Sequence, residues 1–341
     1  MAKPTFGKKE TDGGAYFSAP SSSLQFISSG CRLLDCVLGG GWVLGRISNI
    51  IGDKSTGKTL LAIEACANFA HQYPRGDIYY REAEAAFDVQ YAQTLGLPTS
   101  RMDFSDAFHT VEDMFEDLSK VTTGSNKRPA LYIVDSLDAL SDRAELGREI
   151  DKGSYGAEKA KQMSELFRRL TKKVEQSKVC VIIISQVRDN IGVTFGRKTT
   201  RSGGRALDFY SSQVVFLAHI KRLKRTISKV ERVHGVTIKA FCDKNKVGLP
   251  FRECEFDIRF AYGIDDIGAN LKWLAEVGRL DTLDLTKAEV PRLIDSLETS
   301  TPAEIASIRD DLDAAVVKVW YEIEQKFLPS RSKYGDTHDR E

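Results

Sequence analysis

The sequence predicts an α/β fold in which a mainly parallel central sheet, flanked by helices, is built around a phosphate-binding loop. Residues 52–59 read G-D-K-S-T-G-K-T, which fits the pattern G-x-x-x-x-G-K-[ST]. A β-branched stretch at 46–51 precedes this loop, and a good helix former at 60–67 follows it. The motif therefore has the strand–loop–helix context that it requires, and we expect it to bind a nucleoside triphosphate. An ordinary glycine-rich turn is the alternative.

The chemistry of the loop explains its spacing. Glycines let the backbone curl, so that successive N–H groups and the helix N-terminus face an anion. Lys58 is expected to reach the β- and γ-phosphates, and the Thr59 hydroxyl to hold Mg²⁺. The predicted nucleotide-binding residues of the loop are Gly52, Asp53, Lys54, Ser55, Thr56, Gly57, Lys58 and Thr59.

Composition limits the class of protein. A chain of 341 residues that is 42% hydrophobic can form one large core and a small accessory domain. Apolar runs stay well short of the ~20 residues of a membrane span, and no secretory signal is evident, so we expect a cytoplasmic protein without membrane partners. The net charge of +1 leaves polyanion affinity to local basic patches. Six cysteines without C-x-x-C spacing predict buried free thiols, and five scattered histidines disfavour a zinc site.

Polar residues follow three further predicted strands. The strand at 77–80 leads into Glu82-Ala83-Glu84, and a carboxylate at such a strand end can orient an attacking water. The apolar strand at 130–135 closes with Asp135, which would serve the magnesium through its water shell. The strand at 181–185 is followed by Gln186, a polar group positioned to sense a γ-phosphate.

The segment 157–176 predicts an amphipathic helix that has Lys161 and Arg168 on one face. A solvated basic face is the alternative interpretation of these cations. Residues 187–205 have no clear period, which predicts a long loop, and such loops in compact domains are usually functional or disordered.

A hairpin is expected from strands at 213–220 and 236–241 that are joined by a basic turn at 221–225. It leads to Lys244 and Lys246, which in isolation would be interpreted as surface charge. Another alternating strand is expected at 255–260.

These patterns predict that the chain is divided into three parts. Residues 1–25 are expected to form a flexible arm and are a candidate oligomerisation segment. Residues 26–280 form the predicted core. Residues 281–341 are expected to be a small helical domain with a frayed tail, because Thr301-Pro302-Ala303-Glu304 is a capping box and a helical apolar stripe follows it.

The order of these elements resembles the RecA-type DNA strand-exchange recombinases over roughly residues 27–280. Besides the phosphate loop, several blocks fall in the family's order and at close to its spacing. They are residues 27–30, 82–88, 134–140, 186–188, 191–196, 203–207 and 244–246. The resemblance implies a RecA-like P-loop ATPase core that uses ATP and Mg²⁺.

The resemblance also implies residue roles. Glu84 would activate water, Asp88 and Tyr91 would contact adenine, and Gln186 would couple the γ-phosphate to a DNA loop. Two lysines would reach the ATP of the next protomer, so ATP would lie between subunits. The implied catalytic residues are Glu84, Lys58, Gln186, Lys244 and Lys246.

Two DNA-binding loops are implied at about 145–156 and 187–204. Cations and glycine amides would neutralise phosphates without reading sequence, and apolar side chains would wedge between bases. The implied DNA-binding residues are Tyr155, Lys161, Arg168, Arg188, Ile191, Val193, Gly203, Gly204 and Arg205.

The sequence also departs from the bacterial pattern. The N-terminal arm is short and turn-rich, residues 85–86 and 197–201 differ, and the C-terminal part lacks a strongly acidic tail. These differences suggest a divergent member, such as one encoded by a phage and acting in the cytoplasm of the infected bacterial cell. They leave the mode of polymerisation open.

The resulting functional hypothesis is a DNA-dependent ATPase that forms helical homo-oligomeric filaments on single-stranded DNA. It would pair that strand with a homologous duplex and exchange strands in recombination and repair of DNA damage. Loading proteins or single-strand-binding proteins are expected as further partners. The alternatives are a recombinase paralogue that acts as a mediator without exchanging strands, and a hexameric helicase of the same superfamily.

Overall fold

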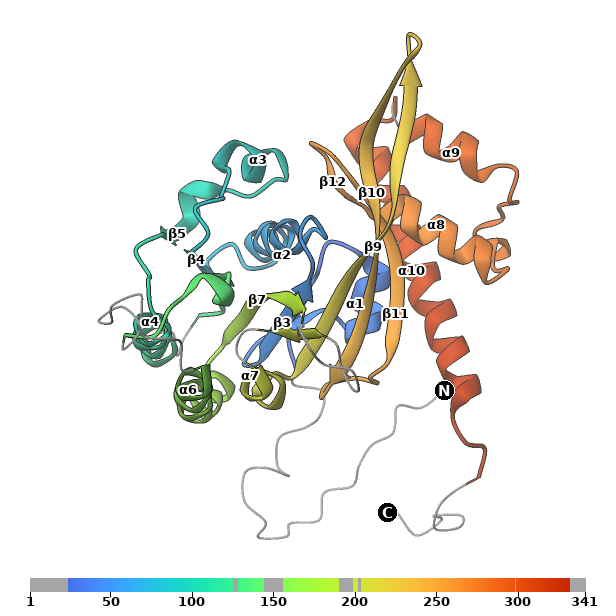
Figure 1. The fold of residues 1–341 in the computed structure, drawn as a ribbon. Coiled ribbons are helices and arrows are strands. Elements are labelled where there is room, and N and C mark those ends of the chain that lie inside the picture. Colours follow the sequence, from blue (N-terminus) through green and yellow to red (C-terminus); the bar gives the residue numbers. More distant parts are fainter. Residues whose placement is uncertain are drawn as a thin grey trace.

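The computed structural model describes residues 24–124, 128–143, 156–189, 199–201, 204–297 and 299–331. A central sheet crosses the molecule with helices on both faces (Figure 1). The strand order is β12-β11-β10-β9-β3-β7-β6-β4-β5, and β8 pairs with β7 off this path. The predicted α/β class is confirmed.

Among the described residues, six neighbouring strands pair in parallel. They are β3 (Ile47–Gly52), β4 (Asp77–Glu82), β5 (Met102–Ser105), β6 (Ala130–Asp135), β7 (Val179–Asp189) and β9 (Gln213–Ile227). Every residue of β3 and β6 is buried. Strands covered on both faces are expected to be nearly continuous apolar runs, which explains why these segments could be predicted.

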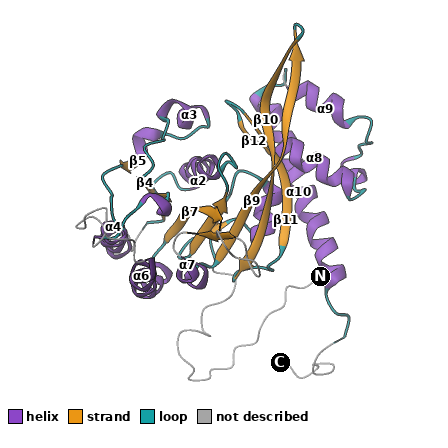
Figure 2. Ribbon diagram, viewed as in Figure 1, coloured by secondary structure: helices purple, strands orange, loops and turns teal. Residues whose placement is uncertain are grey.

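The remaining strands pair in antiparallel fashion. They are β10 (Val230–Asn245), β11 (Arg252–Arg259) and β12 (Gly263–Asp265) beyond β9, β8 (Thr199–Arg201) on β7, and the separate pair β1 (Phe26–Ile27) and β2 (Trp42–Val43). The hairpin of β9 and β10 projects beyond the body of the sheet (Figure 2).

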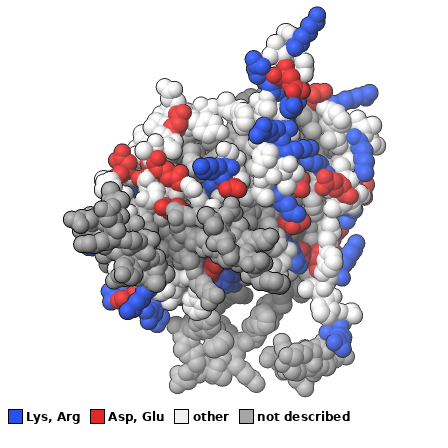
Figure 3. Space-filling view, viewed as in Figure 1, with Lys and Arg blue, Asp and Glu red and all other residues white. Residues whose placement is uncertain are grey.

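The predicted basic turn at 221–225 is wrong, because these residues lie inside β9. The chain turns instead at Ser228 and Lys229, which have φ values of 51° and 67°. The residues on either side of this turn, Thr226-Ile227 and Val230, are β-branched and favour an extended backbone. The basic residues are therefore displayed along an exposed strand, and Figure 3 shows Lys and Arg gathered on the projecting hairpin. Such a local concentration of charge is what a chain of net charge +1 needs for polyanion affinity.

Helices cover both faces of the sheet, and on each face a hydrophobic cluster lies between the sheet and its helices. On β6, Tyr132 and Val134 face one cluster, whereas Leu131 and Ile133 face the other, as the two-residue period of a strand requires. The first cluster is completed by α4 (Val111–Gly124), α6 (Gly156–Gln176) and α7 (Gly204–Tyr210). The opposite face carries α1 (Arg32–Leu38), α2 (Lys58–Gln72), α3 (Val89–Thr94), α8 (Asp266–Glu276), α9 (Val290–Leu297) and α10 (Pro302–Phe327). Short 3₁₀ turns lie at Thr99–Arg101, Leu137–Ala139 and Leu280–Leu283.

The predicted long loop at 187–205 is partly regular structure. Strand β7 continues to Asp189, and Val187 pairs with Arg201 of β8 in an antiparallel register. Helix α7 then begins at Gly204. Residues 190–198 and 202–203 lie outside the described residues. The prediction missed the short strand because three residues are too few to show a period.

The C-terminal helix α10 begins at the predicted capping box, where Thr301 and Glu304 bond reciprocally. Its buried residues Leu312, Val316 and Val319 join the same hydrophobic cluster as the N-terminal Leu34. The division of the chain at 281 remains a prediction. All six cysteines are free thiols, and five of them are buried. Within the described ranges, no helix is long and apolar enough to cross a membrane.

Candidate nucleotide-binding and hydrolysis site

The phosphate loop joins the last residue of β3 to the first residue of α2. A Cβ at Gly52 would collide with the Thr56 hydroxyl and lie 2.9 Å from the Leu217 carbonyl oxygen. Gly57 has a φ of +82°, and a Cβ there would lie 2.5 Å from Cδ1 of Ile258. At Gly52 the backbone passes its neighbours too closely for a side chain, and at Gly57 the left-handed φ disfavours one, so glycine suits both positions of the motif.

Helix α2 begins at Lys58 and contains 15 residues, so its first N–H groups and its dipole favour an anion at the loop. Asp53, Lys54 and Ser55 are exposed, whereas Thr56 is buried. The Lys58 ammonium donates to the Asp53 carbonyl oxygen at 2.8 Å and therefore lies folded over the loop. Burial lowers the pKa of Lys58, and nearby carboxylates oppose that shift. The loop has the shape and charge that fit a triphosphate.

Parallel pairing brings four strand ends to one edge of the sheet. Gly52 lies opposite Gln186 across β3 and β7, and Glu82 lies opposite Asp135 across β4 and β6. Strands β6 and β7 are themselves neighbours. The phosphate loop, Asp135 and Gln186, which were separate features of the sequence, therefore meet beside one another.

Asp135 is the buried acid of this edge, with 5% of its surface exposed. Its Oδ2 accepts a hydrogen bond from the Tyr80 hydroxyl at 2.7 Å, and the Thr59 side chain also hydrogen-bonds to its carboxylate. Burial raises the pKa of Asp135, and these hydroxyls oppose the rise. A hydroxyl and a carboxylate are oxygen ligands that suit Mg²⁺, which usually takes its other ligands from phosphates and water. In the part of the chain that the structure describes, no cluster of three or more acidic, cysteine or histidine side chains could hold a metal alone.

Glu84 is an exposed acid that lies between two hydrogen-bond donors. Its Oε1 accepts from Nε2 of Gln186 at 2.8 Å and from the Ser136 hydroxyl. The backbone N–H of Gln186 in turn donates to Oδ2 of Asp138 at 2.6 Å. The hydrogen bonds thus connect the loop after β4 to the strand β7. A solvent-exposed carboxylate held in this way can orient a water molecule and accept its proton.

Glu82 is a positioning residue that the sequence analysis did not identify. Its side chain is buried, and Oε1 accepts from the N–H groups of Glu84 and Ala86 at 2.9 and 3.0 Å. Oε2 accepts from the N–H of Ala85 at 2.9 Å, where φ is +55°. One carboxylate therefore fixes the turn that carries Glu84. The sequence offered only two acids two residues apart, and no signal in it distinguishes the buried acid from the exposed one.

The predicted adenine contacts lie on the segment that follows this turn. The Asp88 side chain caps α3 by accepting from the Tyr91 N–H at 3.0 Å. Tyr91 is half-buried, and burial raises its pKa. Both residues are therefore fixed at the start of α3, with Asp88 exposed and Tyr91 against the core.

Lys244 and Lys246 lie away from the phosphate loop of their own chain. The Lys244 ammonium donates to the carbonyl oxygens of Asp208 and, at 2.9 Å, of Phe209, and Lys246 donates to Phe209 at 3.4 Å. These carbonyls belong to the last turn of α7, whose dipole favours cations. The role of these lysines at the ATP site of the next protomer stays a prediction.

The predicted DNA-binding residues divide into three groups. Lys161 and Arg168 are exposed on α6, while four residues of its apolar stripe are buried, namely Met163, Phe167, Leu170 and Val174. Arg188 lies in β7, and Gly204 and Arg205 begin α7, which lies beside α6 (Figure 1). The other four lie outside the described residues: Tyr155, Ile191, Val193 and Gly203.

A family model of the RecA N-terminal domain matches residues 9–265. The chain belongs to the RecA family. Among its relatives, Protein RecA of Synechococcus sp. (strain CC9311) is 36% identical over 255 residues, or 75% of this chain and 64% of the relative. Protein RecA of Prochlorococcus marinus (strain NATL1A) is 36% identical over 253 residues, or 74% of this chain and 64% of the relative. The predicted RecA-type resemblance is confirmed, and the chain spans about 64% of the length of these RecA relatives.

The role of Glu82 can be tested by replacing it. In Glu82→Ala the turn loses three hydrogen bonds, so Glu84 is misplaced and ATP turnover should fall by roughly a hundredfold. ATP binding should change little, because the phosphate loop is untouched. Turnover and binding would be measured together, with the exposed Asp106→Ala as the control. Equal losses of binding and turnover would show that Glu82 acts on the whole domain rather than on Glu84.

Proposed function

We propose that this protein is an ATP-dependent recombinase that forms filaments on single-stranded DNA and exchanges strands with a homologous duplex. One observation carries the proposal: a single sheet edge holds the phosphate loop, Asp135, Glu84 and a Gln186 amide that contacts Glu84. Membership of the RecA family and the relatives named Protein RecA support it.

Each residue of the edge has a part in hydrolysis. When bound, ATP and Mg²⁺ supply the phosphoryl group and neutralise its charge, with Thr59 and, through water, Asp135 as the residues that would hold the metal. Lys58 stabilises negative charge on the phosphates, and Glu84 orients the attacking water and accepts its proton. Gln186 contacts Glu84 and lies in β7, which continues to Asp189, so it can relay the state of the nucleotide toward the DNA-binding segment.

DNA would be held through its phosphates. Lys161 and Arg168 present exposed cations on α6, and Gly204 and Arg205 lie at the start of the neighbouring helix α7. Such contacts neutralise the backbone without reading sequence, which suits a protein that must accept any single strand. Lys244 and Lys246 would complete the ATP site of the next protomer in the filament, and single-strand-binding or loading proteins would assist assembly in the cytoplasm.

The first test is ATP hydrolysis with and without single-stranded DNA, with the same samples imaged in a slowly hydrolysed ATP analogue. We expect strong stimulation by DNA together with helical filaments, and neither from Lys58→Ala, which lacks the phosphate-binding ammonium. DNA-independent hydrolysis with closed rings would favour a helicase instead. Small oligomers that bind ATP but do not exchange strands would favour a mediator.

A mixing experiment tests whether ATP lies between subunits. Lys58→Ala and a double variant, Lys244→Ala with Lys246→Ala, should each be inactive alone. A mixture should regain part of the activity, because some interfaces then combine an intact loop with intact lysines from the neighbour. The control mixes Lys58→Ala with Glu84→Gln, which are expected to damage the same half-site and should not complement. If the lysines act within their own chain, neither mixture will regain activity.

A further inference from the structure

The Glu64 side chain links the phosphate-loop helix α2 to the start of β12. Residues 260–264, which join β11 to β12 and include the first two residues of β12, are called the β11–β12 turn below. Its Oε1 accepts a hydrogen bond from the Ile264 N–H at 3.1 Å. Gly263 has a φ of +105°, and a Cβ there would collide with the same oxygen. Gly30 has a φ of +86°, and its Cβ would lie 3.1 Å from Oε2. The carboxylate therefore lies between two glycines and close to the backbone of two other segments.

The β11–β12 turn and the strand before it lie beside elements that carry predicted nucleotide-binding residues. Ile258 of β11 lies against Gly57 of the phosphate loop. On the other side, a Cβ at Gly263 would lie 2.9 Å from Cδ2 of Leu95, the residue that ends α3. Helix α3 carries Tyr91, and the charge of Glu64 adds to the rise in the Tyr91 pKa caused by burial. Glu64 thus lies where α2, α3 and the turn meet.

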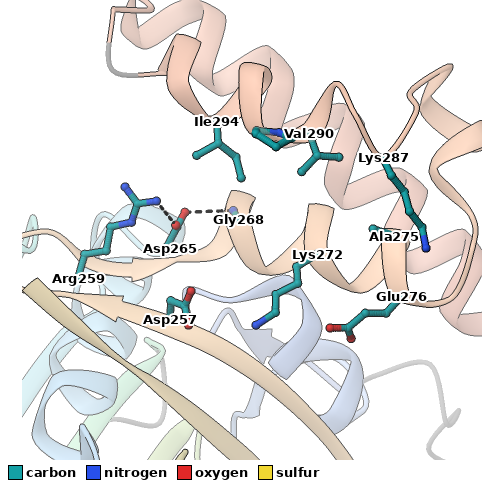
Figure 4. Close-up of a pocket in the computed structure, with 11 residues that line it drawn as sticks. Asp257, Arg259, Asp265, Gly268, Lys272, Ala275, Glu276, Lys287, Val290 and Ile294 are labelled. Atoms are coloured by element: carbon teal, nitrogen blue, oxygen red, sulfur yellow. Dashed lines mark hydrogen bonds and ion pairs between the residues drawn. The ribbon is translucent and has the colours of Figure 1, made fainter. Parts of the chain in front are cut away.

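The far side of β12 is anchored separately, as Figure 4 shows. Asp265 accepts from the Gly268 N–H at 3.0 Å and so caps α8, and it pairs with Arg259 of β11 at 2.6 Å. These residues line a pocket of about 400 Å³ between β11, α8 and α9. Such contacts fix β12 to α8 and β11, whereas the Glu64 hydrogen bond fixes it to α2.

The protonation state of Glu64 guides the choice of variants. Burial raises the pKa of its carboxyl to about 7, and Asp266 of α8 adds to the rise. The Ile264 N–H and Arg309 of α10 oppose it. Near neutral pH the carboxyl is therefore partly protonated, and a neutral glutamine is a close substitute in both charge and shape.

We propose that Glu64 is a positioning residue for the nucleoside side of the ATP site. Its hydrogen bond holds the β11–β12 turn and the adjoining end of α3 against α2, so that these walls keep their place beside the phosphate loop. The inference rests on the proposed ATP-dependent function. Loss of the acceptor releases the turn and weakens binding of the nucleoside, while the cradle for the triphosphate, formed by Gly52, Gly57 and Lys58, is unchanged.

Two variants of matched size separate the hydrogen bond from packing. Glu64→Leu fills the space without an acceptor, and Glu64→Gln keeps an acceptor oxygen. For each variant, ATP or inorganic tripolyphosphate would be used to displace a bound fluorescent ATP analogue, which gives the affinity for each competitor. Glu64→Leu should bind ATP about tenfold more weakly, which is near the upper end of the effect of one lost hydrogen bond. Its affinity for tripolyphosphate, and both affinities of Glu64→Gln, should stay within about twofold of the wild type. In turnover assays KM should rise and kcat should hold.

The outcomes distinguish this inference from the function on which it rests. Wild-type affinity of Glu64→Leu for ATP would overturn the role of Glu64, as would equal weakening of ATP and tripolyphosphate. Gly263→Ala provides a second variant, since its Cβ displaces the turn from the Glu64 side, and it should reproduce the selective loss of ATP affinity. Failure of the wild-type protein to bind ATP would instead contradict the proposed function itself.

Discussion

Parallel pairing of β3, β7, β6 and β4 places the phosphate loop and the candidate catalytic groups at one edge of the sheet. The register sets Gly52 opposite Gln186 and Glu82 opposite Asp135. Side chains alternate between faces of a strand, so a slip by one residue would turn each polar end group to the wrong side. The two hydrophobic clusters prevent such a slip, because it would expose the apolar residues that cover each face.

At this edge, the acid that ends β4 and the acid two residues later have different roles. Glu82 is buried and its side chain accepts hydrogen bonds from three backbone N–H groups, so its role is to hold the backbone of the turn. Glu84 remains exposed and contacts side chains from two neighbouring strand ends, so it is available to water. The division follows from geometry, since a rigid turn is needed to hold a reactive carboxylate within hydrogen-bond reach of one water position. Gln186 connects that carboxylate to β7, the strand that leads toward the predicted DNA-binding segment.

Much of the fold could be predicted because its central strands are buried on both faces and its phosphate loop has a fixed spacing. The helix with Met163 and Phe167 was likewise evident from its period, and both side chains are buried. The hairpin turn at Ser228 could not be found, because no glycine or asparagine marks it and the run of basic residues before it interrupts the apolar alternation of the strand. The roles of Glu82 and Glu64 depend on backbone N–H groups that only the folded chain brings to them. The three-residue strand β8 is too short to give a recognisable pattern.

The link between DNA binding and hydrolysis is tested most directly by Gln186→Ala. Its amide contacts Glu84, and its strand leads away from the nucleotide, so ATP hydrolysis would be measured in single turnovers with and without single-stranded DNA. We predict that the variant keeps its DNA-independent rate within a few fold and loses the stimulation by DNA, while the exposed Gln176→Ala retains it. Full stimulation of Gln186→Ala would contradict the coupling through Gln186 and Glu84.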